Sequence, residues 1–310
     1  MLLDPLFAVP FFVYGLVLGS FLNVCIYRLP RGLSVVRPGS ACPACGTAIA
    51  WYDNLPVLSW LLLRGRCRAC REPISPRYLA VELLTGFLFL GCYATFGWTL
   101  STFKFCVFSF LLLGLIFTDA EHKLLPDTLT LTGLAIGVTF SLLVPVQDLG
   151  SRLLTMWIKL PVGTHISWRL LSLLDSGLSA AVGASFIYGA REIYRRARGV
   201  EGMGFGDLKL MAMVGAFLGI KLTIFTLFAA SLVGSVFGLG AILAVWSKRT
   251  RRRIVRRHEP AAAARKRAWK SAMLVYRHYE MPFGVFLGSM ALLSAFFGDT
   301  VLRWYWGFYR

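Results

Sequence analysis

The segment PFFVYGLVLGSFLNVCIYRLPRG, residues 10–32, joins a long apolar run to a short basic stretch. No acidic or basic residue interrupts it before Arg28, and apolar runs of roughly 17 to 25 residues can cross a bilayer as a helix. No basic stretch precedes the run and no A-x-A-like site follows it, so we expect a retained span and not a cleaved signal peptide. Because short loops rich in Arg and Lys lie on the cytoplasmic side, the segment predicts a first membrane helix that ends in the cytoplasm.

The composition of the whole chain fits a membrane protein. Its 310 residues are 57% hydrophobic and 15% charged, and the mean hydropathy is +0.65, which excludes a water-soluble globular protein. Candidate spans lie at residues 9–29, 78–98, 100–118, 127–145, 170–190, 207–220, 222–246 and 282–302. We therefore predict an all-α polytopic membrane protein with about eight transmembrane helices. The run from Asp207 is short because Lys221 interrupts it, so merging it with the next run is the alternative count.

The basic residues divide unevenly between the two sides of this arrangement. With eight spans and residues 30–77 in the cytoplasm, both termini lie outside the cytoplasm. Of the 33 Lys and Arg, seven then lie away from the inner face: Lys104, Arg152, Lys159, Arg169, Lys221, Arg303 and Arg310. This asymmetry supports the orientation. The net charge of +18 predicts contact with anionic lipid at the inner face, and it requires no nucleic acid.

The predicted cytoplasmic segment 30–77 carries two CxxC pairs. They are separated by 21 residues and consist of Cys42, Cys45, Cys67 and Cys70. Four thiolates at this spacing suit a structural zinc ion, and about fifty residues are too few to fold by apolar burial alone. The alternative is a pair of disulfides, which rarely persist in the reducing cytoplasm. We predict a small zinc-knuckle-like domain, the four-cysteine domain, between the first two membrane helices.

The acids near the membrane are the candidate catalytic residues, because a carboxylate at bilayer depth is costly. Asp119 closes the third predicted span, Asp127 opens the fourth and Asp207 opens the sixth, while Glu82 lies one turn into the second. The three aspartates lie at the predicted cytoplasmic edge. Two carboxylates in a partly desolvated cleft share a proton, so one acts as a base toward water and the other as an acid toward a carbonyl. This pattern indicates aspartic-protease chemistry.

Three glycines precede Asp207 in GMGFGDLKL, residues 202–210. Gly202, Gly204 and Gly206 lack a β-carbon, so another backbone can come close to them. An extended peptide substrate could lie against this strip beside Asp207. The alternative is a plain loop with Asp207 as the N-cap of the following helix. A phosphate-binding loop is excluded, because no strand precedes the glycines and the lysine spacing is wrong.

Several longer motifs resemble one known family, the bacterial prepilin peptidases, and together they cover most of the chain. They are GLVLGSFLNVCIYRLP at 15–30, the double CxxC with WYDNLPVLSW between its halves, SPRYLAVELLTG at 75–86, TDAEHKLLPDTLTL at 118–131, GMGFGDLKL at 202–210 and PFGVFLG at 282–288. The resemblance implies a GxGD-type aspartyl protease with several membrane spans in the bacterial inner membrane. It implies cleavage of the leader from type IV prepilins or type II secretion pseudopilins, after a glycine on the cytoplasmic side.

The resemblance also assigns residues and a second activity. The first Asp of D-x6-P-D and the Asp of G-x-G-D correspond to Asp119 and Asp207, which are thereby implied to be the catalytic pair. Members with the cysteine loop also methylate the new N-terminus, with S-adenosylmethionine as donor. We expect Asp127 to support the start of its helix. Glu82 is expected to contact substrate, to balance an arginine such as Arg77, or to snorkel near the interface.

Three other functions remain in view at this stage. A presenilin-like intramembrane protease uses a similar acid pair, but it does not explain the double CxxC. An ion-coupled transporter also carries membrane acids, yet it favours repeated halves and acids near the midplane. A purely structural pilus-assembly scaffold would have no use for paired acids such as Asp119 and Asp207.

The motifs predict the organisation of the chain and two departures from the family. The predicted parts are 1–29, the first span; 30–77, the four-cysteine domain; 78–246, the transmembrane protease core; 247–280, a basic cytoplasmic insertion; and 281–310, the last span and C-terminus. The insertion is longer than the family pattern, and Trp269, Met273 and Tyr276 recur at helical spacing in it, so we expect an amphipathic helix. Residues 146–169 are a second extra segment, expected on the far side of the membrane.

Overall fold

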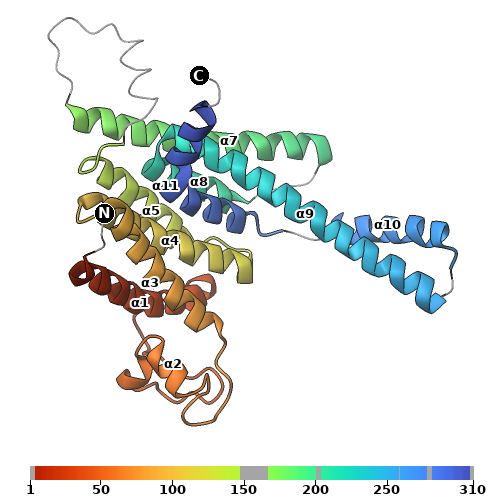
Figure 1. Cartoon of the computed structure of the whole chain (residues 1–310), viewed down its shortest axis with the longest axis horizontal. Coiled ribbons are helices and arrows are strands. Elements are labelled where there is room, and N and C mark those ends of the chain that lie inside the picture. Colours follow the sequence, from red (N-terminus) through yellow and green to blue (C-terminus); the bar gives the residue numbers. More distant parts are fainter. Residues whose placement is uncertain (1–3, 147–166, 200–203, 258, 278–280, 308–310) are drawn as a thin grey trace, which may run out of the picture.

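The computed structural model of this chain describes residues 4–146, 167–199, 204–257, 259–277 and 281–307 (Figure 1). These residues form helices and connecting loops, with no β-strand among them beyond two isolated bridges. The predicted all-α architecture is confirmed. Most of the extra segment 146–169, together with Gly202, lies outside the described residues.

A helix occupies each of the eight predicted spans. These helices are α1 (Pro5–Arg28), α3 (Arg77–Phe96), α4 (Leu100–His122), α5 (Asp127–Ser141), α7 (Trp168–Arg198), α8 (Phe205–Leu218), α9 (Ile220–Arg257) and α11 (Phe283–Gly307). Shorter elements are η1 (Leu29–Arg31), η2 (Trp51–Asn54), α2 (Leu58–Leu62) and α10 (Ala261–Arg277). In the described part of the chain, six helices are long and apolar enough to cross a membrane; α5 and α8, with 15 and 14 residues, are not among them.

The short helix α8 forms the centre of the bundle. Every residue from Leu210 to Leu218 is buried, and α5, α7, α9 and α11 all contact the helix. A helix that is apolar on all sides is stable only when its whole circumference is covered. Two glycines allow the closest approach: a β-carbon on Gly215 would meet the carbonyl of Ser179 in α7, and one on Gly183 would meet that of Met211. Such close backbone packing is typical of membrane helices, and at about 21 Å in length α8 does not have to span the bilayer alone.

The helix ends gather into two groups. One group contains the C-terminal ends of α1, α4 and α7 and the N-terminal ends of α3, α5, α8 and α11, which touch through side-chain contacts. At the other end, Lys221 at the start of α9 pairs with Asp299 near the end of α11 at 2.8 Å. Phe7 of α1 packs there on Trp98, which follows α3. All three predicted aspartates lie in the first group.

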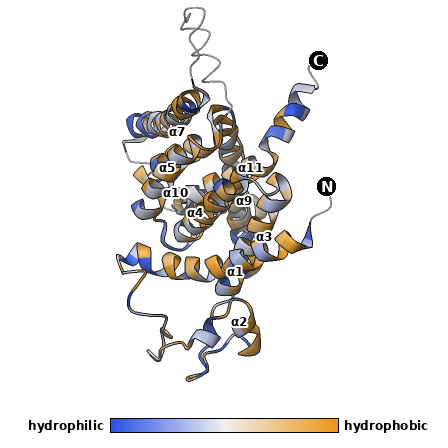
Figure 2. Ribbon diagram, turned by 90° about the vertical axis from the view of Figure 1, so that its left-hand side faces the viewer, coloured by the Kyte–Doolittle hydropathy of each residue, from blue (hydrophilic) through white to orange (hydrophobic). Residues whose placement is uncertain are grey.

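The cysteine-containing segment forms a small separate unit beneath α1 and α3 (Figure 1). It contains η2 and α2 and is joined to the bundle by η1 and by the start of α3. Figure 2 shows hydrophobic residues along α1 and more hydrophilic ones in this unit. The segment therefore lies outside the apolar bundle, as its composition predicts.

Helix α9 continues past the predicted boundary at residue 246 and ends at Arg257. No Gly or Pro occurs between Gly240 and Pro260 to end it earlier. Its 38 residues correspond to about 57 Å, so its last turns extend beyond a bilayer core. Helix α10 folds back against these turns, and the resulting hairpin projects from the bundle (Figure 1). The helix expected in the basic insertion is present, but the insertion begins inside α9.

Candidate active site

Asp119 lies in the last turn of α4, with only 6% of its surface exposed. Its Oδ2 accepts a hydrogen bond of 2.9 Å from the backbone N–H of Val285. This N–H belongs to the first turn of α11, where backbone donors have no partner within the helix. A β-carbon on the neighbouring Gly284 would lie 2.8 Å from the same oxygen. The glycine of PFGVFLG therefore allows the start of α11 to donate to Asp119.

Asp207 lies in the first turn of α8 and is 8% exposed. The N-cap residue is Gly204, in extended conformation, so the interpretation of Asp207 as the N-cap residue is wrong. Its carboxylate instead accepts a hydrogen bond from the backbone of Gly204, the arrangement by which an acid at the third helical position stabilises the start of a helix. Because a carboxylate has two oxygens, Asp207 can accept further hydrogen bonds besides this one.

The fold brings the two acids together. The charge of Asp119 acts on Asp207, although the residues belong to different helices and are 88 positions apart. Buried Leu125, in the α4–α5 loop, packs between the start of α8 and the start of α11. A β-carbon on Gly206 would lie 2.9 Å from Cβ of Leu125, and one on Gly284 would lie 3.1 Å from its Cδ1. The site thus combines the C-terminal end of α4 with the N-terminal ends of α8 and α11.

The glycines of GMGFGDLKL have different surroundings. Gly206 is needed for contact with Leu125, since a side chain there would collide with it. Gly204 is exposed, and the nearest atom to a β-carbon placed on it is 3.8 Å away. Gly202 falls outside the described residues. Only Gly206 is therefore required by the packing, while the open surface at Gly204 agrees with the hypothesis that a peptide lies there.

Asp127 is the first residue of α5, after the N-cap residue Pro126. Its Oδ1 accepts a hydrogen bond of 2.6 Å from Nζ of Lys209 in the first turn of α8. The Asp127 side chain is 59% exposed, and exposed ion pairs contribute about 0 to 1 kcal/mol. The pair links the starts of α5 and α8 beside the catalytic candidates. The structural role of Asp127 stays a prediction, and Lys209 is its partner in the structure.

Glu82 connects the four-cysteine domain to the bundle. It is 7% exposed in α3, and its Oε2 accepts a hydrogen bond of 2.7 Å from the backbone N–H of Val57. Val57 precedes α2 with a φ of 63°, a region that β-branched residues rarely adopt. The Glu82 carboxylate therefore holds a strained turn of the domain against the membrane helices.

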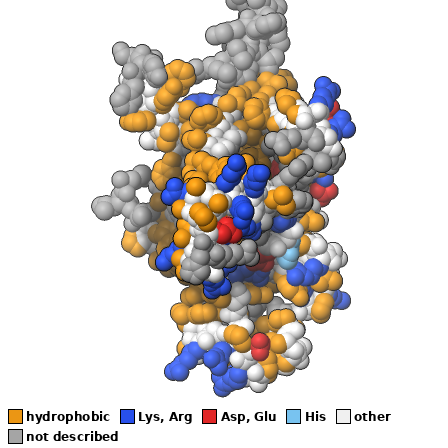
Figure 3. Space-filling model, turned by 90° about the vertical axis from the view of Figure 1, so that its right-hand side faces the viewer, with side chains coloured by type: hydrophobic (Ala, Val, Ile, Leu, Met, Phe, Trp, Pro, Cys, Tyr) orange, Lys and Arg blue, Asp and Glu red, His pale blue; other side chains and the backbone are white. Residues whose placement is uncertain are grey.

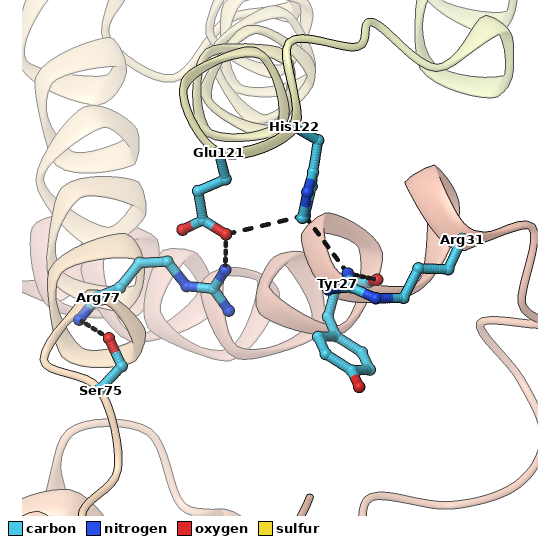
Figure 4. A network of polar contacts seen from close by, with 6 residues as sticks. All are labelled: Tyr27, Arg31, Ser75, Arg77, Glu121 and His122. Carbon is cyan, nitrogen blue, oxygen red and sulfur yellow. Dashed lines mark hydrogen bonds and ion pairs between the residues drawn. The ribbon is translucent and has the colours of Figure 1, made fainter.

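The arginine expected to balance Glu82 has another partner. Arg77 forms an ion pair with Glu121 in the last turn of α4, so its predicted pairing with Glu82 is wrong. Beside it, Nε2 of His122 lies 3.3 Å from Nη1 of Arg31 in η1. Figure 4 shows these side chains joining the ends of α1, α3 and α4. Glu121 and His122 are thus helical residues that tie the three helix ends together one turn beyond Asp119.

The four CxxC cysteines form a second candidate site. Their Sγ atoms all lie within 4.8 Å of one another, and those of Cys42 and Cys70 are 3.9 Å apart. Tetrahedral zinc, with Zn–S distances of about 2.3 Å, separates its sulfurs by about 3.8 Å. All seven cysteines of the chain are free thiols, so the disulfide alternative is wrong. Cys42, Cys45, Cys67 and Cys70 could hold a metal ion.

The two CxxC turns have the same backbone pattern. In the first, the N–H of Cys42 donates to Thr47 and that of Gly46 donates back to Cys42. In the second, the N–H of Cys67 donates to Glu72 and that of Arg71 donates back to Cys67. The residue after each pair has a positive φ, 71° at Gly46 and 61° at Arg71. Two equivalent turns thus present two thiols each to a common centre.

Comparison with known proteins identifies the family. The model described as the bacterial peptidase A24 N-terminal domain matches residues 13–96, and the model described as the type IV leader peptidase family matches residues 106–239. A prepilin leader peptidase/N-methyltransferase of Aeromonas hydrophila is 32% identical over 320 residues, which cover 95% of this chain and 92% of that protein. The chain belongs to the type IV leader peptidase family.

Further family members carry the same name. The prepilin leader peptidase/N-methyltransferase of Myxococcus xanthus is 42% identical over 244 residues, covering 77% of this chain and 64% of that protein. That of Neisseria gonorrhoeae is 34% identical over 258 residues, covering 74% of this chain and 81% of that protein. No solved structure matches the chain.

The family assignment confirms the predicted resemblance and the predicted kind of enzyme, a peptidase of several membrane spans with associated N-methyltransferase activity. The second family model contains both Asp119 and Asp207. It ends at residue 239, before the hairpin of α9 and α10.

Proposed function

We propose that this enzyme removes the leader peptide from type IV prepilins or type II secretion pseudopilins by cleaving after a glycine on the cytoplasmic side, and that it methylates the new N-terminus. One observation carries the peptidase assignment. Two buried carboxylates, Asp119 and Asp207, interact at one end of the bundle, each on its own helix. An ion-coupled transporter would need its acids near the midplane, whereas these lie at the helix ends.

In the proposed mechanism the two aspartates hold one proton between them. The ionised carboxylate takes a proton from a water molecule as the water oxygen bonds to the carbonyl carbon of the scissile peptide. The neutral carboxyl gives its proton to the carbonyl oxygen. The pair then protonates the leaving amine nitrogen, and the C–N bond breaks. The N–H of Val285 fixes one carboxylate oxygen of Asp119, which orients the pair before substrate arrives.

The orientation of the enzyme follows from its charges. The active-site end carries Arg31, Arg77 and Lys209, and the projecting hairpin at the end of α9 is rich in arginine. We place this end in the cytoplasm by the positive-inside rule, with both termini on the opposite side and the hairpin against anionic lipid. The leader would then lie at the basic inner face, while the hydrophobic helix of the substrate lies between membrane helices.

The methyl donor proposed for the second activity is S-adenosylmethionine, as the resemblance implies. When bound, it would supply the methyl group to the amine freed by cleavage.

We also propose that the four-cysteine site holds zinc. Zinc should be present at about one ion per chain, because four thiolates complete its tetrahedral shell. Cys67→Ser should lower the bound zinc severalfold and speed tryptic cleavage near Arg64 and Arg71 by at least about tenfold, since so small a domain depends on its metal. Metal analysis and limited proteolysis of the full-length protein measure both effects. Cys25→Ser, a change at a buried thiol in α1, serves as the matched control; undiminished zinc in the Cys67 variant would refute the assignment.

The proposed activities are tested together by incubating the detergent-solubilised enzyme with a prepilin and S-adenosylmethionine, followed by mass spectrometry. We expect loss of the leader at a glycine and a gain of one methyl group on the new N-terminus. An uncut prepilin under conditions in which a related leader peptidase cuts it would overturn the peptidase proposal. Cleavage without methylation of the new N-terminus would refute only the proposed N-methyltransferase activity.

A further inference from the structure

The hairpin of α9 and α10 contains cavities that the peptidase reaction does not use. Two adjoining cavities of about 420 and 320 Å³ lie between the helices. One wall is a single face of α9, formed by Arg249, Arg252, Arg253 and Arg256. The opposite wall is a single face of α10, formed by Arg267, Lys270, Ser271 and Leu274. We call this space the basic pocket.

The two walls are held in place by contacts between the helices. Ala264, Ala268 and Ala272 are fully or almost fully buried, at intervals of one helical turn, so α10 can pack closely on α9. The Trp246 indole donates a 3.1 Å hydrogen bond to the carbonyl of Arg265. The Arg249 guanidinium donates one of 2.9 Å to that of Ser271. These contacts fix α9 and α10 relative to each other, and with them the two rows of side chains that line the open basic pocket.

The charges in the basic pocket are far from balanced. Glu259 is the only acid between residues 241 and 279, and it pairs with Arg253 at 3.3 Å and Arg267 at 3.6 Å. Among the described residues, no ion pair neutralises Arg252, Arg256 or Lys270. Cations placed side by side repel one another unless an anion lies between them. Figure 3 views the hairpin end-on and shows basic side chains gathered around an acidic one.

The position of the basic pocket along α9 places it at the depth of lipid headgroups. The apolar part of α9 ends at Trp246, and tryptophan is enriched at the membrane interface. The Trp246 ring packs on that of Trp269 in α10, with centroids 6.0 Å apart. The pocket residues of α9 follow Trp246 by three to ten residues, or about 4.5 to 15 Å along the helix. The pocket therefore begins within a headgroup layer of about 5 to 8 Å and continues toward the cytoplasm.

One wall of the basic pocket also offers apolar surface. Leu274 lines the pocket beside Arg267 and Lys270, and it is 66% exposed. A free phosphate ion would make no favourable apolar contact with Leu274. A phospholipid carries acyl chains that are joined to its phosphate through glycerol and can contact this residue. Guanidinium groups bind phosphate oxygens through paired hydrogen bonds. The lining thus matches a ligand with a phosphate at one end and hydrocarbon at the other.

We propose that the basic pocket binds the phosphate-bearing headgroup of an anionic phospholipid from the inner leaflet. The proposal rests on the cytoplasmic orientation given above and not on the catalytic assignment. Binding there would hold α9 and α10 at the membrane surface, and α10 leads directly into α11, whose first turn donates to Asp119. The pocket shares no lining residue with the four-cysteine domain or with the aspartate pair.

Native mass spectrometry of the full-length protein in detergent tests the proposal without any prepilin. The probes are phosphatidylglycerol, phosphatidylcholine with the same acyl chains, and glycerol 3-phosphate. The pocket variant is Arg252→Gln with Arg256→Gln, two exposed residues in no described ion pair. The matched control is Arg251→Gln with Arg265→Gln, two exposed residues outside the pocket lining, which removes the same charge from the opposite faces of α9 and α10. Thermal unfolding checks that both variants are folded, and Lys270→Gln on α10 provides a second pocket variant.

The wild-type protein should bind phosphatidylglycerol at least about tenfold more tightly than phosphatidylcholine. The double pocket variant should lose about 30-fold in affinity and Lys270→Gln about fivefold, since each basic residue near the surface contributes about 1 kcal/mol. The matched control should stay within about twofold of wild type. Equal losses in the pocket variant and the control would overturn the proposal in favour of diffuse attraction. Displacement of the lipid by an equal concentration of glycerol 3-phosphate would overturn it in favour of a soluble phosphate ligand.

Discussion

Asp119→Asn and Asp207→Asn should each lower the rate of prepilin cleavage by at least about 10³-fold. An asparagine amide has nearly the shape of the carboxyl group, but it neither takes a proton from water nor gives one to the carbonyl, and such proton transfer contributes about 10² to 10⁴-fold. Because the two residues act on one water molecule, the double variant should be little slower than either single variant. Mass spectrometry of a timed digestion measures the rates.

Asp127→Asn is the matched control for both substitutions. It removes a carboxylate from the same end of the bundle, yet this carboxylate is exposed and pairs with Lys209. We expect the control to lose at most a few-fold in rate, in line with the small contribution of an exposed ion pair. A rate for Asp207→Asn above that of Asp127→Asn would contradict the catalytic assignment. Unchanged thermal unfolding of all three variants would exclude a loss of fold as the cause.

Gly284→Ala should lower the cleavage rate by about 10²-fold, although residue 284 contributes no side chain to the chemistry. The added β-carbon would lie 2.8 Å from Oδ2 of Asp119 and 3.1 Å from Cδ1 of Leu125. Either α11 or Asp119 must then move, and a displacement of about 1 Å can cost 10²-fold in rate. The hydrogen bond from Val285 to Asp119 is lengthened by the same movement. The loss should appear in kcat, because the substrate-facing surface is unchanged.

Gly298→Ala provides a control on the same helix. Its β-carbon would lie 2.6 Å from Cδ2 of Leu222, so the crowding is similar, but it occurs at the opposite end of α11. We expect a destabilisation of about 1 to 3 kcal/mol from overpacking and nearly normal cleavage per folded molecule. Normal cleavage by the Gly284 variant, or an equal loss in both variants, would show that the approach of α11 to Asp119 does not matter.

Local patterns in the chain were sufficient to predict the helices and the cluster of four cysteines. Apolar length alone predicted a helix at each of eight positions, because a backbone in lipid has to satisfy its own hydrogen bonds. The spacing of Cys42, Cys45, Cys67 and Cys70 predicted their cluster, since each CxxC turn is a local structure. The motifs containing Asp119 and Asp207 predicted that these residues belong together, and the fold places them at one end of the bundle.

The pairing of polar side chains at the helix ends was predicted less well. Arg77 lies five residues before Glu82 in the chain, but it pairs with Glu121, while Glu82 holds Val57 of the four-cysteine domain. Both differences arise from packing between separate elements: α3 packs on α4, whose last turn brings Glu121 to Arg77, and the four-cysteine domain brings Val57 to Glu82. Sequence distance carries no information on which helix ends meet.

The sequence by itself determined the class of the protein, the helices at eight apolar positions, the cluster of four cysteines and the two candidate catalytic acids. Each of these depends on composition, on short-range spacing or on the motifs. Only the tertiary structure decided that α8 is enclosed by four other helices, that Leu125 lies between Gly206 and Gly284, and that Val285 donates to Asp119. It also decided that the arginines of α9 and α10 face one another across a pocket. These features depend on contacts between residues far apart in the chain, which arise only when the helices pack.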